Sequence, residues 1–157
     1  MEWLFTESFG TRDDAGESQG QAFDNETNRD GEDDLDGIDL MEPIEFEAWV
    51  LGRFKRKDYE VKTTPLSGDA GSDGIAISPD NSRFPSYMIQ CKHTQQDKNI
   101  GHSAVEEILN SLDRYDNLPD GIQPLVVTNA NGFTTKARTL ARNQGVRLIS
   151  KNQLHQL

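Results

Sequence analysis

The chain has 157 residues, of which 34% are hydrophobic, so it has enough apolar material for one folded domain but not for two. Its single cysteine excludes an intrachain disulfide and a multi-cysteine zinc site, and no stretch approaches the ~20 apolar residues of a membrane span or resembles a signal peptide, so we expect a cytoplasmic protein. The net charge of −11 comes from residues 1–42, with 14 acidic and 2 basic residues, whereas residues 43–157 hold 13 acidic and 14 basic residues.

The charge distribution divides the chain into an acidic, largely disordered tail, residues 1–42, and a folded domain, residues 43–157. Residues 10–40 lack apolar periodicity, which is typical of disorder. Residues 1–9 are more apolar and are either a docking peptide or a frayed terminus. The acidic run either imitates DNA phosphates and covers a basic cleft, on this chain or on a partner, or it only keeps the protein soluble. Deletion of residues 1–42 would distinguish these alternatives.

The first predicted element of the domain is a helix over residues 44–57, whose apolar side chains recur at helical spacing on one face. At about 100° per residue, Glu47 falls in the middle of that face, whereas Glu45 points away from it. A carboxylate in an apolar stripe is costly unless something pairs it. Glu47 is therefore a candidate site residue, and the alternative is a glutamate that serves only the helix dipole or an ion pair.

Three strands are predicted next, over residues 59–64, 74–78 and 86–92. The Gly-rich stretch that joins the first two contains Asp69, which reads as a turn residue, and ends at Asp73. The stretch between the last two is dense in turn formers. If these two strands pair as a hairpin centred near Ser82, Asp73 lies opposite roughly residue 91.

The third of these strands ends in Gln90-Cys91-Lys92, which is the most informative short motif of the chain. Side chains alternate along a strand, so Gln90 and Lys92 project from one face and Cys91 from the other. Folding alone would favour Val or Ile at such positions. With Asp73 beside the pair, the motif predicts a site that holds a divalent cation and activates a water. Cys91 reads as a small core residue rather than a nucleophile.

The remaining predicted elements alternate between helix and strand. They are a helix over residues 102–115, a strand over 125–128, a helix from Thr134 or Thr135 to Arg142, and a strand over 146–149. The whole order is therefore α-β-β-β-α-β-α-β. This succession predicts a mixed α/β sheet with a hairpin meander and right-handed crossovers, flanked by helices.

Taken in order, the motifs resemble the Mrr-type catalytic domain, a restriction-endonuclease-like branch of the PD-(D/E)xK nuclease superfamily. The resemblance covers about residues 43–155, and an ordered set is more specific than the degenerate superfamily motif alone. The matching segments are Phe46-Glu47, Ser67 to Asp73, Gln90-Cys91-Lys92, Ile100-Gly101, Ala104-Val105, Thr128-Asn129 and Phe133-Thr134.

The resemblance implies roles for the candidate residues. Asp73 would be the metal-binding aspartate, and Gln90 would occupy the position where most of the superfamily carries Glu. Lys92 would be the motif lysine, and Glu47 the supporting helix carboxylate. The expected ligands of Mg²⁺, which Mn²⁺ could replace, are Asp73, the Gln90 side-chain oxygen and the backbone carbonyl of Cys91. Glutamine removes one negative charge from such a site, and Glu47 would help to compensate for it.

The resemblance also implies an activity and a partner, namely a Mg²⁺-dependent endonuclease that acts on double-stranded DNA in restriction or defence against foreign DNA. Lys98, Gly101 and His102 lie at the start of a helix, where free N–H groups can bind a phosphate. Asn129 and Thr134 resemble polar positions of the family and are expected to contact DNA. The alternatives are a nuclease resembling Holliday-junction resolvases or repair enzymes, and a non-catalytic DNA-binding module. A homodimer is expected by analogy alone.

Overall fold

The computed structural model of the chain describes residues 35, 37–64, 73–80 and 83–157. It divides into two compact units, and the second, Gly37–Leu157, holds the helices and strands discussed below. The predictions made for residues 1–34, for Asp69 and for Ser82 lie outside the described residues.

Within the described residues, the strands form one five-stranded sheet in the order β1-β2-β3-β4-β5. Neighbouring strands are antiparallel from β1 to β3 and parallel from β3 to β5, so the sheet is mixed, as predicted. The strands are β1 (Glu60–Thr63), β2 (Gly74–Ile77), β3 (Tyr87–Lys92), β4 (Gln123–Thr128) and β5 (Arg147–Ile149).

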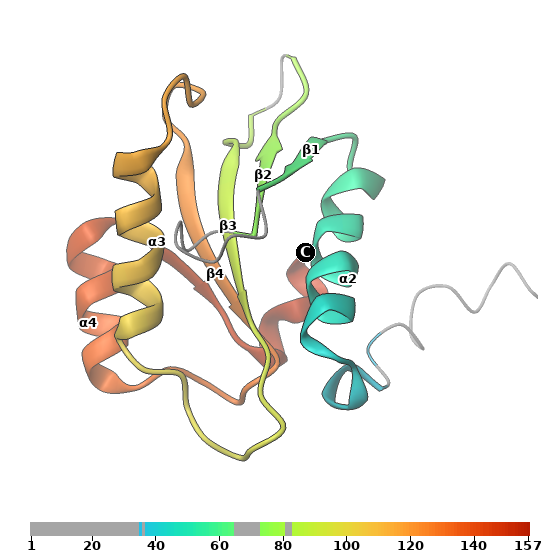
Figure 1. The fold of residues 1–157 in the computed structure, drawn as a ribbon, viewed down its shortest axis with the longest axis vertical. Helices are drawn as coiled ribbons and strands as arrows, with labels where there is room; N and C mark the ends of the chain where they lie inside the picture. Colours follow the sequence, from blue (N-terminus) through green and yellow to red (C-terminus); the bar gives the residue numbers. More distant parts are fainter. Residues whose placement is uncertain (1–34, 36, 65–72, 81–82) are drawn as a thin grey trace, which may run out of the picture. The chain divides into compact units, whose positions relative to one another are not determined.

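Helices cover both faces of this sheet (Figure 1). The helix α2 (Pro43–Arg56) and the 3-10 helix η3 (Lys151–Gln156) lie on one face, and α3 (Ser103–Arg114) and α4 (Thr135–Gln144) lie on the other. The predicted order of helices and strands is thus confirmed. None of the described helices is both long enough and apolar enough to cross a membrane.

The strand β3 separates two hydrophobic clusters, because its side chains point alternately to the two faces. Tyr87 and Ile89 pack in the cluster beneath α2, which also partly covers Cys91, whereas Met88 packs in the cluster beneath α3 and α4. The strand is apolar on both faces until it reaches Gln90. The polar side chains at its end therefore mark a departure from what packing alone requires.

The hairpin of β2 and β3 brings Asp73 close to the end of β3. Gly74 pairs with Ile89, so Asp73 falls beside Gln90, one position from the register expected from the sequence. The turn-forming residues between β2 and β3 had correctly indicated that these two strands pair as a hairpin. A shift of one residue lies within what turn positions alone can define.

The folded unit begins at Gly37. Composition had placed its start six residues later, at Pro43. The single-turn helix η2 (Ile38–Leu40) precedes α2 and inserts Ile38, which is 2% exposed, into the cluster beneath α2. The adjacent Asp39 forms an ion pair with Lys151. One buried side chain within an acidic stretch gives no periodic pattern, so composition could not reveal this element.

We predict that Ile38→Ala lowers the free energy of unfolding by about 2–4 kcal/mol, the usual effect of removing a buried aliphatic side chain. The matched control is Ile44→Ala, because Ile44 is 62% exposed, and this change should have little effect. Urea denaturation of the two variants measures the difference. Equal stability of the two proteins would show that η2 is not part of the folded unit.

Candidate active site

Asp73 lies immediately before β2 and is bound to β3 through both its backbone and its side chain. Its backbone N–H donates to the carbonyl of Ile89 at 2.8 Å, and its Oδ2 accepts a hydrogen bond from the N–H of Cys91 at 2.5 Å. Its carbonyl accepts from the N–H of Thr64 at 3.2 Å. The Asp73 carboxylate is therefore fixed at the end of β3.

Gln90 and Lys92 project together toward α3, as the alternation along β3 predicted. Gln90 Nε2 donates to Glu107 Oε2 at 2.6 Å, and Lys92 Nζ contacts the same oxygen at 2.5 Å. Gln90 is 4% exposed, whereas the side chains of Lys92 and Glu107 are 32% and 42% exposed. One carboxylate oxygen thus holds both polar side chains of the motif.

The oxygen of the Gln90 amide, Oε1, differs from the other polar atoms of the site. It is buried and lacks a hydrogen-bond partner among the described residues. A buried polar atom left in this state costs about 1–3 kcal/mol, so such atoms are rare and require an explanation. An amide oxygen is a ligand suited to Mg²⁺ or Mn²⁺.

The backbone of Cys91 completes a set of oxygen atoms around Asp73. In a strand, the N–H and the carbonyl of one residue point to the same neighbouring strand. Because the Cys91 N–H binds Asp73, the Cys91 carbonyl also faces that side. In the described part of the chain, no three His, Cys, Asp or Glu side chains form a metal-binding group. A cation here would accordingly rely on the amide and backbone oxygens as well as Asp73, and these donors fit Mg²⁺.

Glu47 reaches Asp73 from α2, on the other side of the sheet from Glu107. Burial raises the pKa of Glu47, and the negative charge of Asp73 raises it further. Burial likewise raises the pKa of Asp73, although the N–H of Cys91 and the charge of Lys92 act in the opposite direction. Two carboxyl groups in this relation favour either a proton or a cation between them.

Two neighbouring groups have other roles. Glu45 points away from the site, as expected, and its Oε2 accepts a hydrogen bond from the N–H of Glu42 at 2.8 Å in a capping box that starts α2. Burial and the negative charges of Asp73 and Glu47 raise the pKa of the Cys91 thiol well above its ordinary value. The thiol is therefore protonated and inert, which agrees with its interpretation as a core residue.

The residues expected to bind DNA fall into two groups. Gly101 and His102 immediately precede α3, where a phosphate could be bound, whereas Lys98 is exposed in the loop five residues before that helix. Thr134 instead caps α4, because its Oγ1 accepts a hydrogen bond from the N–H of Ala137 at 3.2 Å. A capping role accounts for this threonine without DNA.

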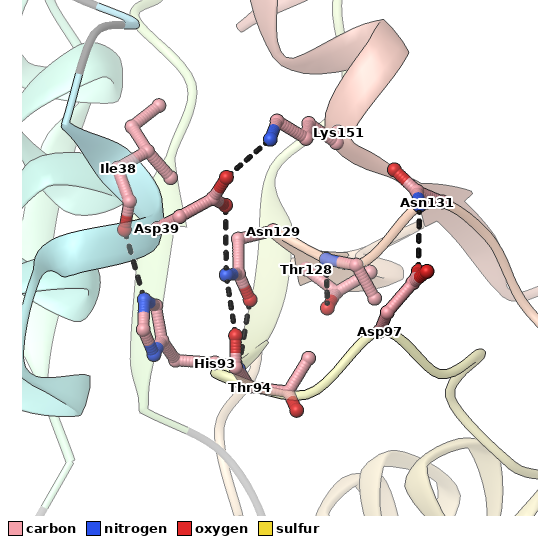
Figure 2. Close-up of polar contacts among 10 residues, drawn as sticks. Ile38, Asp39, His93, Thr94, Asp97, Thr128, Asn129, Asn131 and Lys151 are labelled. Atoms are coloured by element: carbon pink, nitrogen blue, oxygen red, sulfur yellow. Dashed lines mark hydrogen bonds and ion pairs between the residues drawn. The ribbon is translucent and has the colours of Figure 1, made fainter.

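Asn129 has a structural role within the chain, and its expected contact with DNA stays a prediction. Asn129 is 4% exposed, and its side chain joins the ends of β3 and β4 to η2 (Figure 2). Its Oδ1 accepts from the N–H of Thr94 at 2.8 Å, and its Nδ2 donates to the Thr94 carbonyl at 2.7 Å and to Asp39 Oδ1 at 3.2 Å. Both amide hydrogens are thus used within the chain.

A polar pocket of about 280 Å³ opens beside this contact. It is lined by Asp39, Thr94, Gln95, Gln96, Asp97, Asn129, Ala130, Asn131 and Lys151. Its charged groups already have partners, since Asp39 pairs with Lys151 and Asp97 accepts from Asn131 at 3.0 Å (Figure 2). The pocket contains neither Asp73 nor Gln90, so it is a neighbour of the site and not the site itself.

Comparison with known proteins places the chain in a family. The family model of the Mrr catalytic domain, described as a restriction endonuclease, matches residues 38–157. The chain belongs to this restriction endonuclease family. No curated protein matches it.

Three solved structures resemble this Mrr-type domain. The DNA modification-dependent restriction endonuclease AspBHI has a TM-score of 0.55 and 16% identity, over 78% of this chain and 33% of AspBHI. The protein of unknown function AF1548 has a TM-score of 0.48 and 22% identity, over 63% of this chain and 53% of that one. MspJI in complex with a 27-mer oligonucleotide has a TM-score of 0.47 and 21% identity, over 80% of this chain and 27% of MspJI. At these identities the likeness to AspBHI shows the fold alone, and the chain spans only 27% to 53% of the three proteins.

Glu107 is the site residue that sequence reasoning missed. It lies on α3 between Ala104 and Ser111, three residues after one buried side chain and four residues before the other. These spacings place the three side chains on one face of the helix. The criterion that identified Glu47, a carboxylate on a buried helical stripe, would therefore have identified Glu107 as well.

We predict that Glu47→Gln raises the melting temperature of the Mrr-type domain when divalent cations are removed with EDTA. The change removes one of two carboxyl groups that are forced together, so it relieves an unfavourable interaction in the folded state. Glu106→Gln is the control, because it removes the same charge from an exposed position. A melting temperature for Glu47→Gln at or below that of the wild type would contradict this account of the site.

We predict that Asn129→Ala lowers the free energy of unfolding by about 1–3 kcal/mol, because it leaves the backbone of Thr94 without its partner. The control is Asn131→Ala, an exposed asparagine of the same segment, which should cost less. Wild-type stability of Asn129→Ala would contradict this structural role, and weakened DNA binding of the folded variant would support the expected contact with DNA.

Proposed function

We propose that this chain is a metal-dependent endonuclease that hydrolyses DNA phosphodiester bonds at the site around Asp73. The observation that carries the proposal is the buried, unpartnered Oε1 of Gln90, beside a fixed carboxylate and an ammonium group. The proposed cofactor is Mg²⁺, with Mn²⁺ able to replace it, and the proposed type is PD-(D/E)xK with Gln90 at the variable position.

The proposed ligands are an Asp73 oxygen, Gln90 Oε1 and the Cys91 carbonyl. When bound, the cation would polarise a non-bridging phosphate oxygen and neutralise the charge that develops in the transition state. Because Gln90 is neutral, this set carries one negative charge less than a set with glutamate. Glu47 lies close enough to Asp73 for their charges to interact, and it would supply negative charge near the cation from the α2 side.

Lys92 is the group proposed to act on the attacking water. Its ammonium is only partly exposed, is held by Glu107, and is close enough to Asp73 to lower the pKa of that carboxyl group. In this position it can orient a water and favour its hydroxide form. A lysine in an ordinary surface ion pair would not share its acceptor atom with the amide of a buried glutamine.

The proposed substrate is double-stranded DNA, and the proposed role is restriction or another defence against foreign DNA. Membership of the restriction endonuclease family supports this choice. A resolvase-like or repair nuclease uses the same chemistry on other DNA structures and is the alternative. Concerted cleavage of both strands usually uses two active sites, so we also propose a homodimer on DNA.

We predict that the protein nicks or linearises supercoiled plasmid with Mg²⁺ or Mn²⁺ and not with EDTA. Asp73→Ala and Lys92→Ala should each reduce the rate by about 100-fold or more, because each removes a group that acts on the reacting atoms. Asp80→Ala, at an exposed turn aspartate, is the control and should cleave normally. Cation-independent cleavage, or full activity of Asp73→Ala, would contradict the proposal.

The preferred DNA structure distinguishes the two biological roles. We predict faster cleavage of linear duplexes, methylated or unmethylated, than of four-way junctions, measured at equal concentrations with the same cation. Faster cleavage of the junction would support the resolvase-like alternative. Binding of DNA without cleavage of any of these substrates would support a non-catalytic module.

A further inference from the structure

We propose that Glu107 is a positioning residue of the active site, which fixes the amide of Gln90 with its oxygen toward the cation. Glu107 would thereby also carry the negative charge that a glutamate at position 90 would otherwise provide. This inference rests on the proposed function, because it assigns a role in the same metal site. It concerns a residue on α3, outside the motif segments that first indicated the site.

The first argument is the asymmetry of the Gln90 amide. Its Nε2 donates hydrogen bonds and its Oε1 only accepts them, whereas an ionised carboxylate only accepts. Glu107 Oε2 lies 2.6 Å from Nε2, so a rotation of the amide by half a turn would place two acceptors against each other. Glu107 therefore determines that Oε1 is the end left without a partner, and this oxygen is the proposed ligand.

The second argument is the burial of the amide. Gln90 is only 4% exposed, so bulk water has little access to form hydrogen bonds with either end of its amide. Without Glu107, no acceptor holds Nε2, and the amide can turn its N–H groups toward the cation. A residue that selects one orientation thus increases metal affinity without touching the metal.

The third argument concerns charge. A glutamate at position 90 would place a second carboxylate where the Gln90 amide now meets Glu107, at a separation near 2.6 Å. Lys92 could compensate for only one of them, since it contacts the single oxygen Oε2 of Glu107 at 2.5 Å. The site therefore accommodates one carboxylate, at position 90 or at position 107. Gln90 and Glu107 together are equivalent in charge to a glutamate on β3 that faces an amide on α3.

Binding of Mn²⁺ to the protein without DNA tests the positioning role independently of catalysis. The electron paramagnetic resonance signal of free Mn²⁺ gives the dissociation constant. Glu107→Ala should weaken binding by about 10- to 100-fold, the usual effect of removing a residue that orients a ligand. Glu106→Ala, the exposed neighbour on α3, should bind Mn²⁺ like the wild type.

The outcomes of this titration separate the two proposals. If the wild type binds Mn²⁺ and Glu107→Ala binds it equally well, the positioning role is wrong and the proposed function stands. If the wild type does not bind Mn²⁺, the proposed function is wrong, and the role of Glu107 is wrong with it. Circular dichroism of each variant confirms that it is folded.

A charge exchange tests the third argument by thermal unfolding in EDTA. Gln90→Glu alone should lower the melting temperature, because two carboxylates then face each other. The double variant Gln90→Glu/Glu107→Gln should recover most of this loss and should bind Mn²⁺ within about threefold of the wild type. Additive effects of the two changes on the melting temperature, or a double variant that does not recover Mn²⁺ binding, would overturn the inference.

Discussion

The hydrogen bond from the N–H of Cys91 to Asp73 Oδ2 is the constraint on which the site depends. It forms where the pairing of β2 with β3 ends, so it replaces a bond of the sheet with one to a carboxylate. A carboxylate held by a backbone N–H at a strand end cannot turn to solvent freely. Asp73 is thereby fixed beside the end of β3, close to Gln90, Cys91 and Lys92.

The site is electrostatically unfavourable on its own, which fits a site built for a cation. Glu47 and Asp73 lie close together, Lys92 is paired with Glu107, and burial raises the pKa values of Glu47 and Asp73. Local strain or repulsion of this kind is maintained by the surrounding structure, and it concentrates at functional sites. Here the support comes from the two hydrophobic clusters beneath α2 and α3, which hold the opposing helices against β3.

The features of the fold and the site that depend on local periodicity could be predicted from the sequence. The alternation along β3 placed Gln90 and Lys92 on one face and Cys91 on the other, and the helical spacing placed Glu47 on the apolar face of its helix. Contacts between distant residues leave no such pattern. Asp39 and Lys151 are 112 residues apart, and only the folded chain shows that they meet beside Asn129. The contacts of Asn129 within the chain were therefore not predicted, and the start of the folded unit was placed after η2. Glu107 was omitted for a different reason. Its position on the buried face of α3 can be inferred from helical spacing, but its contacts with Gln90 and Lys92 on β3 cannot.

A crystal of the protein soaked in Mn²⁺ offers the most direct measurement, because the anomalous scattering of manganese locates the ion without reference to activity. The account predicts an ion within about 2.0–2.4 Å of an Asp73 carboxylate oxygen and of Gln90 Oε1, with the Gln90 Nε2 still directed at Glu107. An ion bound elsewhere, or a Gln90 amide turned so that its oxygen faces α3, would contradict it.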